Sequence, residues 1–136
     1  MNNDIKKPTA KEAVKDQIAS NLRHIESRIT DMSEKMNSNY IHFFEWQAEE
    51  MFKVQKRREF HTALSKAIDE TYKDTDLTTW LLAIAYRKVN DIARNSLTRS
   101  STSQMANIAH LLNLEAEQEM IRDLESLAHV AEYYSK

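Results

Sequence analysis

The sequence of 136 residues contains no glycine, no cysteine and a single proline. Phosphate-binding loops, dinucleotide-binding turns, nucleophile elbows and EF-hand calcium loops all depend on glycine, so its absence argues against each of them. Tight hairpin turns need residues that tolerate positive φ, so β-sheets are disfavoured as well. Without cysteine there is no disulfide, no zinc–thiolate site and no thiol nucleophile.

Long apolar runs and a strong excess of charge are also missing. The longest apolar run, from Trp80 to Tyr86, is far shorter than the roughly 20 residues that a membrane-spanning helix needs. No apolar segment follows the lysines near the N-terminus, as it would in a secretory signal. The net charge of -2 gives no overall attraction to nucleic acids or anionic membranes. We therefore expect a cytoplasmic protein with no membrane partner, no cofactor and no evident small-molecule substrate.

What remains is a composition typical of a globular helical protein, with 41% hydrophobic and 29% charged residues. The length suits one domain. The sequence predicts an all-α bundle of four to five helices, at least two of them long and with coiled-coil-like seams. Residues 1–8 are expected to be a flexible N-terminal lead, and residues 9–136 a single α-helical domain.

The first helix has the clearest start, because Thr9 and Glu12 have the spacing of a capping box. Its apolar residues recur at alternating gaps of four and three, which is the pattern of a coiled-coil seam. They are Ile18, Leu22, Ile25, Ile29, Met32 and Met36. This row needs a helical partner, either from the same chain or from a second copy.

A second helix is predicted over about 39–73, with Ser38 or Asn39 as its cap. Its apolar residues change face halfway along. This indicates either a kink near residues 56–58 or a helix that touches two different partners. The segment 73–76 is the clearest loop, with Thr75 or Asp76 as the next cap.

The third and fourth helices are predicted over about 77–97 and 104–135, joined by a Ser/Thr-rich linker at 98–103. The third is apolar nearly all round where it begins, which predicts a place at the centre of the bundle. The fourth carries one continuous apolar stripe, although Asn113 can divide it in two.

Aromatic residues gather between Tyr40 and Trp46. Most of this cluster is explained as core, but the helical wheel places Trp46 among charged residues rather than with Phe44. Trp46 is therefore the strongest candidate for a contact outside the protomer. The predicted protein-interaction residues are Trp46, Phe43, Phe60 and Leu64.

An alternative is a nucleic-acid-binding accessory protein, because Lys53, Lys56, Arg57 and Arg58 form a short basic stretch near aromatic residues. The competing interpretation is that the acids between Glu115 and Glu132 neutralise these cations. Residues 105–127 also resemble a helix-turn-helix with its turn at Asn113, but the helix that would enter the DNA begins with carboxylates.

A further alternative is enzymatic. The spacing of Arg122 and His129 resembles the arginine–histidine motif of the HEPN ribonucleases, which are small helical dimers with a composite active site. The resemblance implies metal-independent RNA cleavage. A chain with this many arginines and histidines yields about one such match by chance, so no catalytic residue is assigned.

Two clusters of histidine and glutamate, one from His42 to Glu49 and one from Glu125 to Glu132, are explained as solvated faces, and no metal site is predicted. The sequence favours a non-enzymatic helical interaction module of the adaptor, inhibitor or scaffold type. Its expected partners are a second copy of itself, as a homodimer, and another protein.

Overall fold

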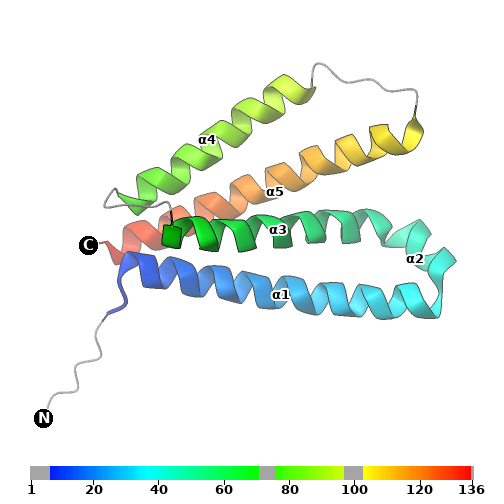
Figure 1. Ribbon diagram of the computed structural model, residues 1–136, viewed down its shortest axis with the longest axis horizontal. Helices are drawn as coiled ribbons and strands as arrows, with labels where there is room; N and C mark the ends of the chain where they lie inside the picture. The colour runs from blue at the N-terminus through cyan, green and yellow to red at the C-terminus, as the bar shows by residue number, and fades with distance from the viewer. Residues whose placement is uncertain (1–6, 71–75, 97–102, 136) are drawn as a thin grey trace, which may run out of the picture.

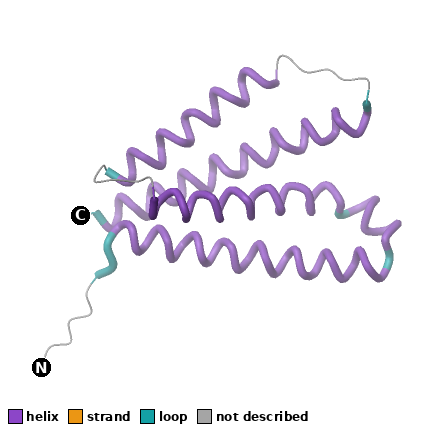
Figure 2. The backbone as a smooth tube through the Cα atoms, viewed as in Figure 1, coloured by secondary structure: helices purple, strands orange, loops and turns teal. Residues whose placement is uncertain are grey.

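The computed structural model describes residues 7–70, 76–96 and 103–135, which form helices without any strand. The helices are α1 (Ala10–Ser38), α2 (Tyr40–Trp46), α3 (Ala48–Glu70), α4 (Leu77–Ser96) and α5 (Gln104–Tyr134). Figure 2 shows how little of this part of the chain is non-helical. The predicted all-α bundle is confirmed. The segments 1–6, 71–75 and 97–102 lie outside the described residues. They include most of the expected N-terminal lead, of the loop at 73–76 and of the linker at 98–103.

The bundle is built from two antiparallel pairs, α1 with α3 and α4 with α5 (Figure 1). Helix α5 contacts α1, α3 and α4, whereas α4 packs chiefly on α5. The start of α1 and the end of α5 lie at the same end of the bundle, and the short helix α2 lies at the opposite end (Figure 1). Helix α5 is therefore the element that joins the two pairs.

The predicted capping box at the start of α1 is confirmed. The backbone N–H of Glu12 donates to Oγ1 of Thr9 over 3.1 Å, and the backbone N–H of Thr9 donates to Oε1 of Glu12 over 2.9 Å. Two amide groups that have no partner within the helix are satisfied in this way. The first two turns of α1 also carry Ala13 and Val14, both of which are buried.

We expect the Thr9→Ala variant to lose about 1 kcal/mol of unfolding free energy, because the hydroxyl that accepts from Glu12 disappears. Urea unfolding followed by far-UV circular dichroism measures this loss. Thr9→Ser keeps an acceptor oxygen and serves as the control. Equal stability of the alanine and serine variants would contradict a stabilising role for the cap.

The apolar row of α1 is covered within the same chain. Ile18 joins the main core, whereas Ile25, Ile29 and Met32 join a second cluster towards α2. The main core contains Val14, Ile18, Leu64, Ile68, Leu77, Leu81, Ala85, Leu124, Leu127, Ala128 and Ala131. The second cluster contains Ile25, Ile29, Met32, Phe43 and Val54. The partner that the row requires is therefore another helix of the protomer.

The predicted second helix is broken, but at Gln47 rather than near residues 56–58. Gln47 has φ -131° and ψ -11°, outside helical geometry, and Asn39 caps the short helix that precedes it. Helix α3 then runs unbroken to Glu70. Its change of apolar face has the other predicted explanation, since Val54 belongs to the second cluster and Leu64 to the main core.

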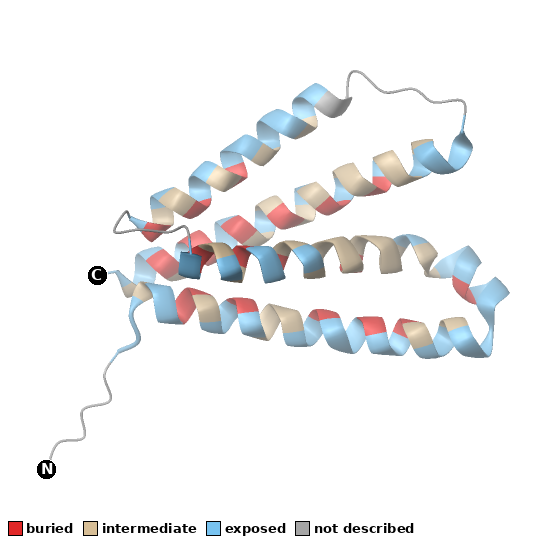
Figure 3. Cartoon of the chain, in the orientation of Figure 1, coloured by how far each residue is buried: buried red, intermediate tan, exposed pale blue. Residues whose placement is uncertain are grey.

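One expectation about placement was wrong. Helix α4 lies at the edge of the bundle rather than at its centre, and it leaves Leu82, Tyr86 and Val89 exposed (Figure 3). Helix α5 is continuous through Asn113, so the turn that a helix-turn-helix requires is absent from it. The cap predicted at Thr75 or Asp76 is present at Asp76, whose side chain accepts from the N–H of Thr78. The side chain of Ser103, at the end of the predicted linker, accepts from the N–H of Ala106 and starts α5.

Candidate interaction surface

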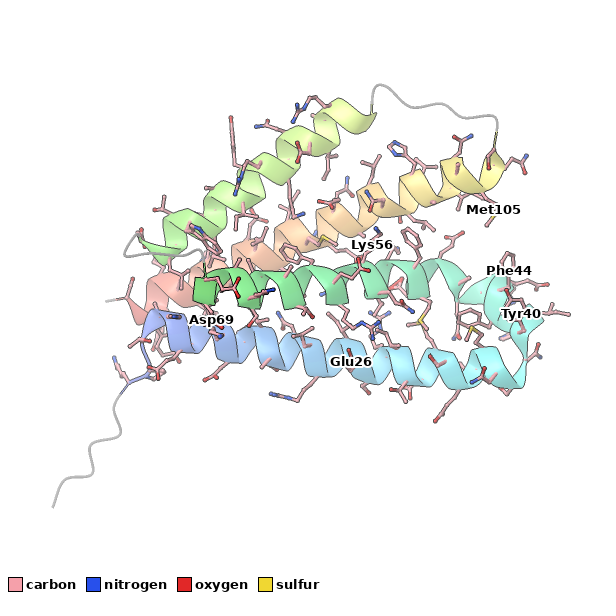
Figure 4. The ribbon with its side chains drawn as sticks, in the orientation of Figure 1. Glu26, Tyr40, Phe44, Lys56, Asp69 and Met105 are labelled. Atoms are coloured by element: carbon pink, nitrogen blue, oxygen red, sulfur yellow. The ribbon has the colours of Figure 1, made fainter. Side chains whose placement is uncertain are left out.

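Large hydrophobic side chains are exposed at the end of the bundle that holds α2. Figure 4 shows Tyr40 and Phe44 on α2 and Met105 on α5 at this end. We call the following set the apolar end: Tyr40, Ile41, Phe44, Trp46, Met105 and Ile108. Trp46 has 72% of its surface exposed, more than any other of these side chains. A tryptophan this exposed is unusual in a protein surface that contacts only water.

The local sequence explains why α2 presents these side chains outward. The side chain of Asn39 accepts from the N–H of His42 over 3.1 Å and starts the helix, and Gln47 ends it after two turns. Phe43 alone is buried, and it fixes α2 to the second cluster. The remaining large side chains of this helix, Tyr40, Ile41, Phe44 and Trp46, are exposed.

A hollow of about 270 Å³ lies within the apolar end. It is lined by Phe44, Ala48, Glu49, Phe52, Met105, Ile108, Ala109 and Leu112. Its α5 wall belongs to the same helical stripe as Ala116 and Met120, which are buried further along. The core-facing stripe of α5 therefore continues past the helices that cover it, because α5 diverges from α3 towards this end (Figure 1).

The structure separates the predicted interaction residues. Trp46 lies on the surface, whereas Phe43 and Leu64 are buried in different core clusters. Phe60 is half-buried against the main core, and the ammonium of Lys88 lies 5.0 Å from the centre of its ring. Of the four, only Trp46 is placed for a contact with another molecule.

The basic stretch of α3 is largely occupied by ion pairs. Lys53 Nζ lies 3.2 Å from Oε1 of Glu115, and Arg58 Nη1 lies 3.4 Å from Oε1 of Glu26. Burial alone would lower the pKa of Lys53, but the hydrogen bond to Glu115 and the neighbouring carboxylates raise it above its ordinary value. These pairs compete with phosphate for the same cations, which weakens the nucleic-acid alternative.

Arg57 has the strongest of these interactions. Its Nε and Nη2 atoms donate to the two carboxylate oxygens of Asp123 over 3.0 and 3.1 Å, and Glu119 lies 3.9 Å away. The remaining cation, Lys56, lies over the ring of Phe52 at 5.8 Å. The predicted neutralisation by acids between Glu115 and Glu132 is thus confirmed for Lys53 and Arg57.

Asp123 also binds His61, which is fully buried. Nε2 of His61 lies 3.0 Å from Oδ2 of Asp123, so the imidazole donates to the carboxylate in the tautomer that carries hydrogen on Nε2. Burial alone would raise the pKa of Asp123, but the hydrogen bonds from His61 and Arg57 and the charge of Arg57 hold it below its ordinary value. The three side chains form a polar connection between α3 and α5 inside the bundle.

A second exposed apolar surface lies on α4. Leu82, Tyr86 and Val89 are separated by four and three residues, so they share one side of the helix, and we call them the α4 seam. Tyr86 has 69% of its surface exposed. A shallow hollow lies between Leu82 and the C-terminal half of α5. It is lined by Thr78, Leu82, Glu125, Ala128, His129 and Glu132.

Arg122 and His129 are both exposed on α5, and His129 borders the shallow hollow beside the α4 seam. Among the described residues, no three histidine, aspartate or glutamate side chains are grouped closely enough to hold a metal ion. None of the helices in the described ranges combines the length and the apolar character that crossing a membrane requires.

A scan against protein-family models and searches of curated proteins and of solved structures find no match for this chain. The candidate surfaces are therefore defined by geometry alone. Trp46 was identifiable from its sequence neighbours, but Met105 and Ile108 were not. Nothing in the stripe of α5 distinguishes the turns that neighbouring helices cover from the turns that they leave open.

Proposed function

We propose that this chain is a non-enzymatic helical interaction module, which binds another protein through its apolar end and forms a homodimer through the α4 seam. The exposure of Phe44, Met105 and Ile108 around an apolar hollow carries the first part of this proposal, and Trp46 is exposed on the same short helix as Phe44. Burying such a cluster against a partner removes a large apolar area from water, and tryptophan dominates the energetics of many protein interfaces.

The homodimer is supported by the spacing of the α4 seam. Alternating gaps of four and three residues suit a second helix that crosses at about 20°. The seam is only partly covered within the protomer, since about half of Leu82 and Val89 and more of Tyr86 is exposed. Two copies related by a two-fold axis can bury the same seam against each other, which is the commonest form of a homodimer.

Charge favours an antiparallel arrangement of the two α4 helices. With Tyr86 at the two-fold axis, Arg94 of one copy lies opposite Thr78 of the other, because each is eight residues from Tyr86. Thr78 borders the shallow hollow that Glu125 and Glu132 also line. The basic end of each seam would then meet the acidic flank of the second copy, and Arg94 would gain carboxylates in addition to Asp91.

We expect the wild-type chain to sediment as a dimer and Tyr86→Glu to sediment as a monomer. The substitution places two glutamates, one from each copy, at the two-fold axis. The free energy of dimerisation is expected to fall by about 2 kcal/mol or more, as for a residue at the centre of an interface. Sedimentation equilibrium over a range of concentrations measures this.

Ile41→Glu is the matched control, since Ile41 is similarly exposed but lies at the apolar end. This variant is expected to remain dimeric. A wild-type chain that is monomeric at every concentration, or a Tyr86→Glu variant that stays dimeric, would contradict the assignment of the dimer to the α4 seam. Far-UV circular dichroism establishes that each variant is folded.

A further inference from the structure

We infer that the apolar end binds an amphipathic helix of another protein, apolar on one face and flanked by lysine or arginine. This inference rests on the proposed function and specifies the chemistry of the partner. Two observations carry it: the hollow continues a stripe of α5 that packs against helices further along, and the charged residue that lines it is a glutamate, Glu49.

The walls of the hollow have the composition of a helix-packing groove. One wall comes from the end of α2 and the start of α3, and the other from the first turns of α5. Small side chains, Ala48 and Ala109, lie in it together with the larger Phe52 and Ile108. Alanines let the backbone of an added helix approach closely, while the larger residues interdigitate with its apolar side chains.

The hollow also continues the face of α5 on which other helices of the bundle pack. Leu112 lines the hollow, and the next residues of its stripe, Ala116 and Met120, are buried in the bundle. The same face of α5 therefore packs against helices along most of its length and meets none at Met105. An added helix would extend this packing by about two turns, or about 10 Å.

Among the residues that line the hollow, Glu49 alone is charged, although Lys56 lies over the ring of Phe52, another lining residue. Between Asn39 and Phe52 the sequence contains Glu45, Glu49 and Glu50 and no lysine or arginine, and residues 103–112 contain no charged residue. Glu50 is neutralised by Arg28, whose Nη2 lies 2.9 Å from Oε1. Burial alone would raise the pKa of Glu50, but Arg28 and Lys53 lower it.

Glu45 and Glu49 differ from Glu50, because within the described residues neither takes part in an ion pair. Glu49 itself lines the hollow. Cations on either side of the partner's apolar stripe would meet these carboxylates and add both affinity and orientation.

This charge pattern also selects against a second copy at the same place. Two apolar ends facing each other across a two-fold axis would place Glu49 of both copies in one interface, and like charges in an interface are unfavourable. The groove therefore suits a partner of opposite charge, whereas self-association is assigned to the α4 seam.

Three fluorescently labelled synthetic peptides test this inference by fluorescence polarisation. The first has leucines on one helical face and lysines beside them, the second replaces the lysines by glutamates, and the third is a scrambled form of the first. We expect the basic peptide to bind, with an affinity that falls as salt is added. The acidic and scrambled peptides are expected to bind at least about tenfold more weakly.

Matched variants locate the binding. Ile108→Asp should abolish it, whereas Leu111→Asp should not, since Leu111 is also an exposed hydrophobic residue of α5 but does not line the hollow. The double variant Glu45→Lys, Glu49→Lys should reverse the order of the basic and acidic peptides. Circular dichroism of each variant shows whether its helices are retained.

The outcomes of these binding experiments distinguish the basic partner from the docking surface itself. Equal binding of the basic and acidic peptides, lost in Ile108→Asp, would overturn the basic partner but leave the apolar end as a docking surface. Absence of binding by every peptide would overturn both the helical partner and the role of the apolar end, and leave only the dimer. A wild-type dimer that Ile108→Asp dissociates would show a second copy at this site and would also overturn the inference.

Discussion

Replacement of Asp123 by alanine is expected to destabilise the fold by about 2–4 kcal/mol, one of the two largest effects we predict for a single substitution. The carboxylate is the shared acceptor of Arg57 and His61, and its side chain is mostly buried. Its removal leaves a guanidinium and an imidazole donor largely withdrawn from water without their acceptor, which costs more than the lost ion pair alone.

Urea unfolding at neutral pH measures this loss, and Asp69→Ala is the control. Asp69 forms ion pairs with Lys11 and Lys15 between α3 and α1, but it is exposed. Solvent screens such pairs, so little change is expected. A similar loss in the two variants would show that burial of the Arg57–Asp123–His61 connection adds nothing.

Acid provides a second measurement on the same residue. The pKa of Asp123 is lower in the folded chain than in the unfolded chain, so its ionised form stabilises the fold. This contribution is complete above the ordinary aspartate pKa of 3.8 and disappears as the pH falls through the lowered value. The difference in stability between wild type and Asp123→Ala should therefore shrink on acidification below about pH 4.

Replacement of Leu81 by alanine is the other large expected effect, at about 2–5 kcal/mol. Leu81 has no exposed surface and belongs to the main core, where α4 meets α3 and α5. The cavity left by its side chain would weaken the attachment of an edge helix. Hydrogen exchange should then become faster in α4 than in α1, because α4 packs chiefly on a single neighbour.

The adjacent leucine provides the control. Leu82 is 46% exposed, so Leu82→Ala should cost less than about 1 kcal/mol. Because Leu82 belongs to the α4 seam, both variants are compared in the Tyr86→Glu background, where the proposed dimer does not contribute. Equal losses of unfolding free energy at the two positions would mean that burial of Leu81 does not stabilise the packing of α4.

The features that local chemistry determines were predictable from sequence. The pairing of Thr9 with Glu12 depends on residues three apart in one helical turn, and it is present as predicted. The caps at Asn39, Asp76 and Ser103 follow in the same way from side chains that bind nearby amides. The row from Ile18 to Met36 gave the period of α1, although not its partner.

The features that depend on tertiary placement were not predictable. The apolar opening of α4 suggested a central helix, yet one side of it is left as the exposed seam around Tyr86. Asn113 weakens a helix only slightly, and packing on both sides of it keeps α5 continuous. Sequence periodicity shows which residues prefer burial. It does not show at which residues a helix has no neighbour to pack against, as α5 has none at Met105.

The same limit applies to the candidate site. Trp46 stood out because its neighbours on the helical wheel are charged, whereas Phe43 lies only three residues earlier and is buried. Phe43 packs in the second cluster with residues of α1 and α3, whereas Trp46 remains on the surface. The tertiary contacts of this short helix therefore decide which of its aromatic side chains are core and which are surface.

The packing of α1 against α5 has a kinetic consequence. Val14 and Leu127 belong to the same core although they are more than a hundred residues apart in the sequence. Bringing together two residues so far apart in the chain costs more loop-closure entropy than forming the pair of α1 and α3. We therefore expect the contact between α1 and α5 to form late in refolding, after that pair. Substitutions at these late contacts should accelerate unfolding and leave the refolding rate almost unchanged.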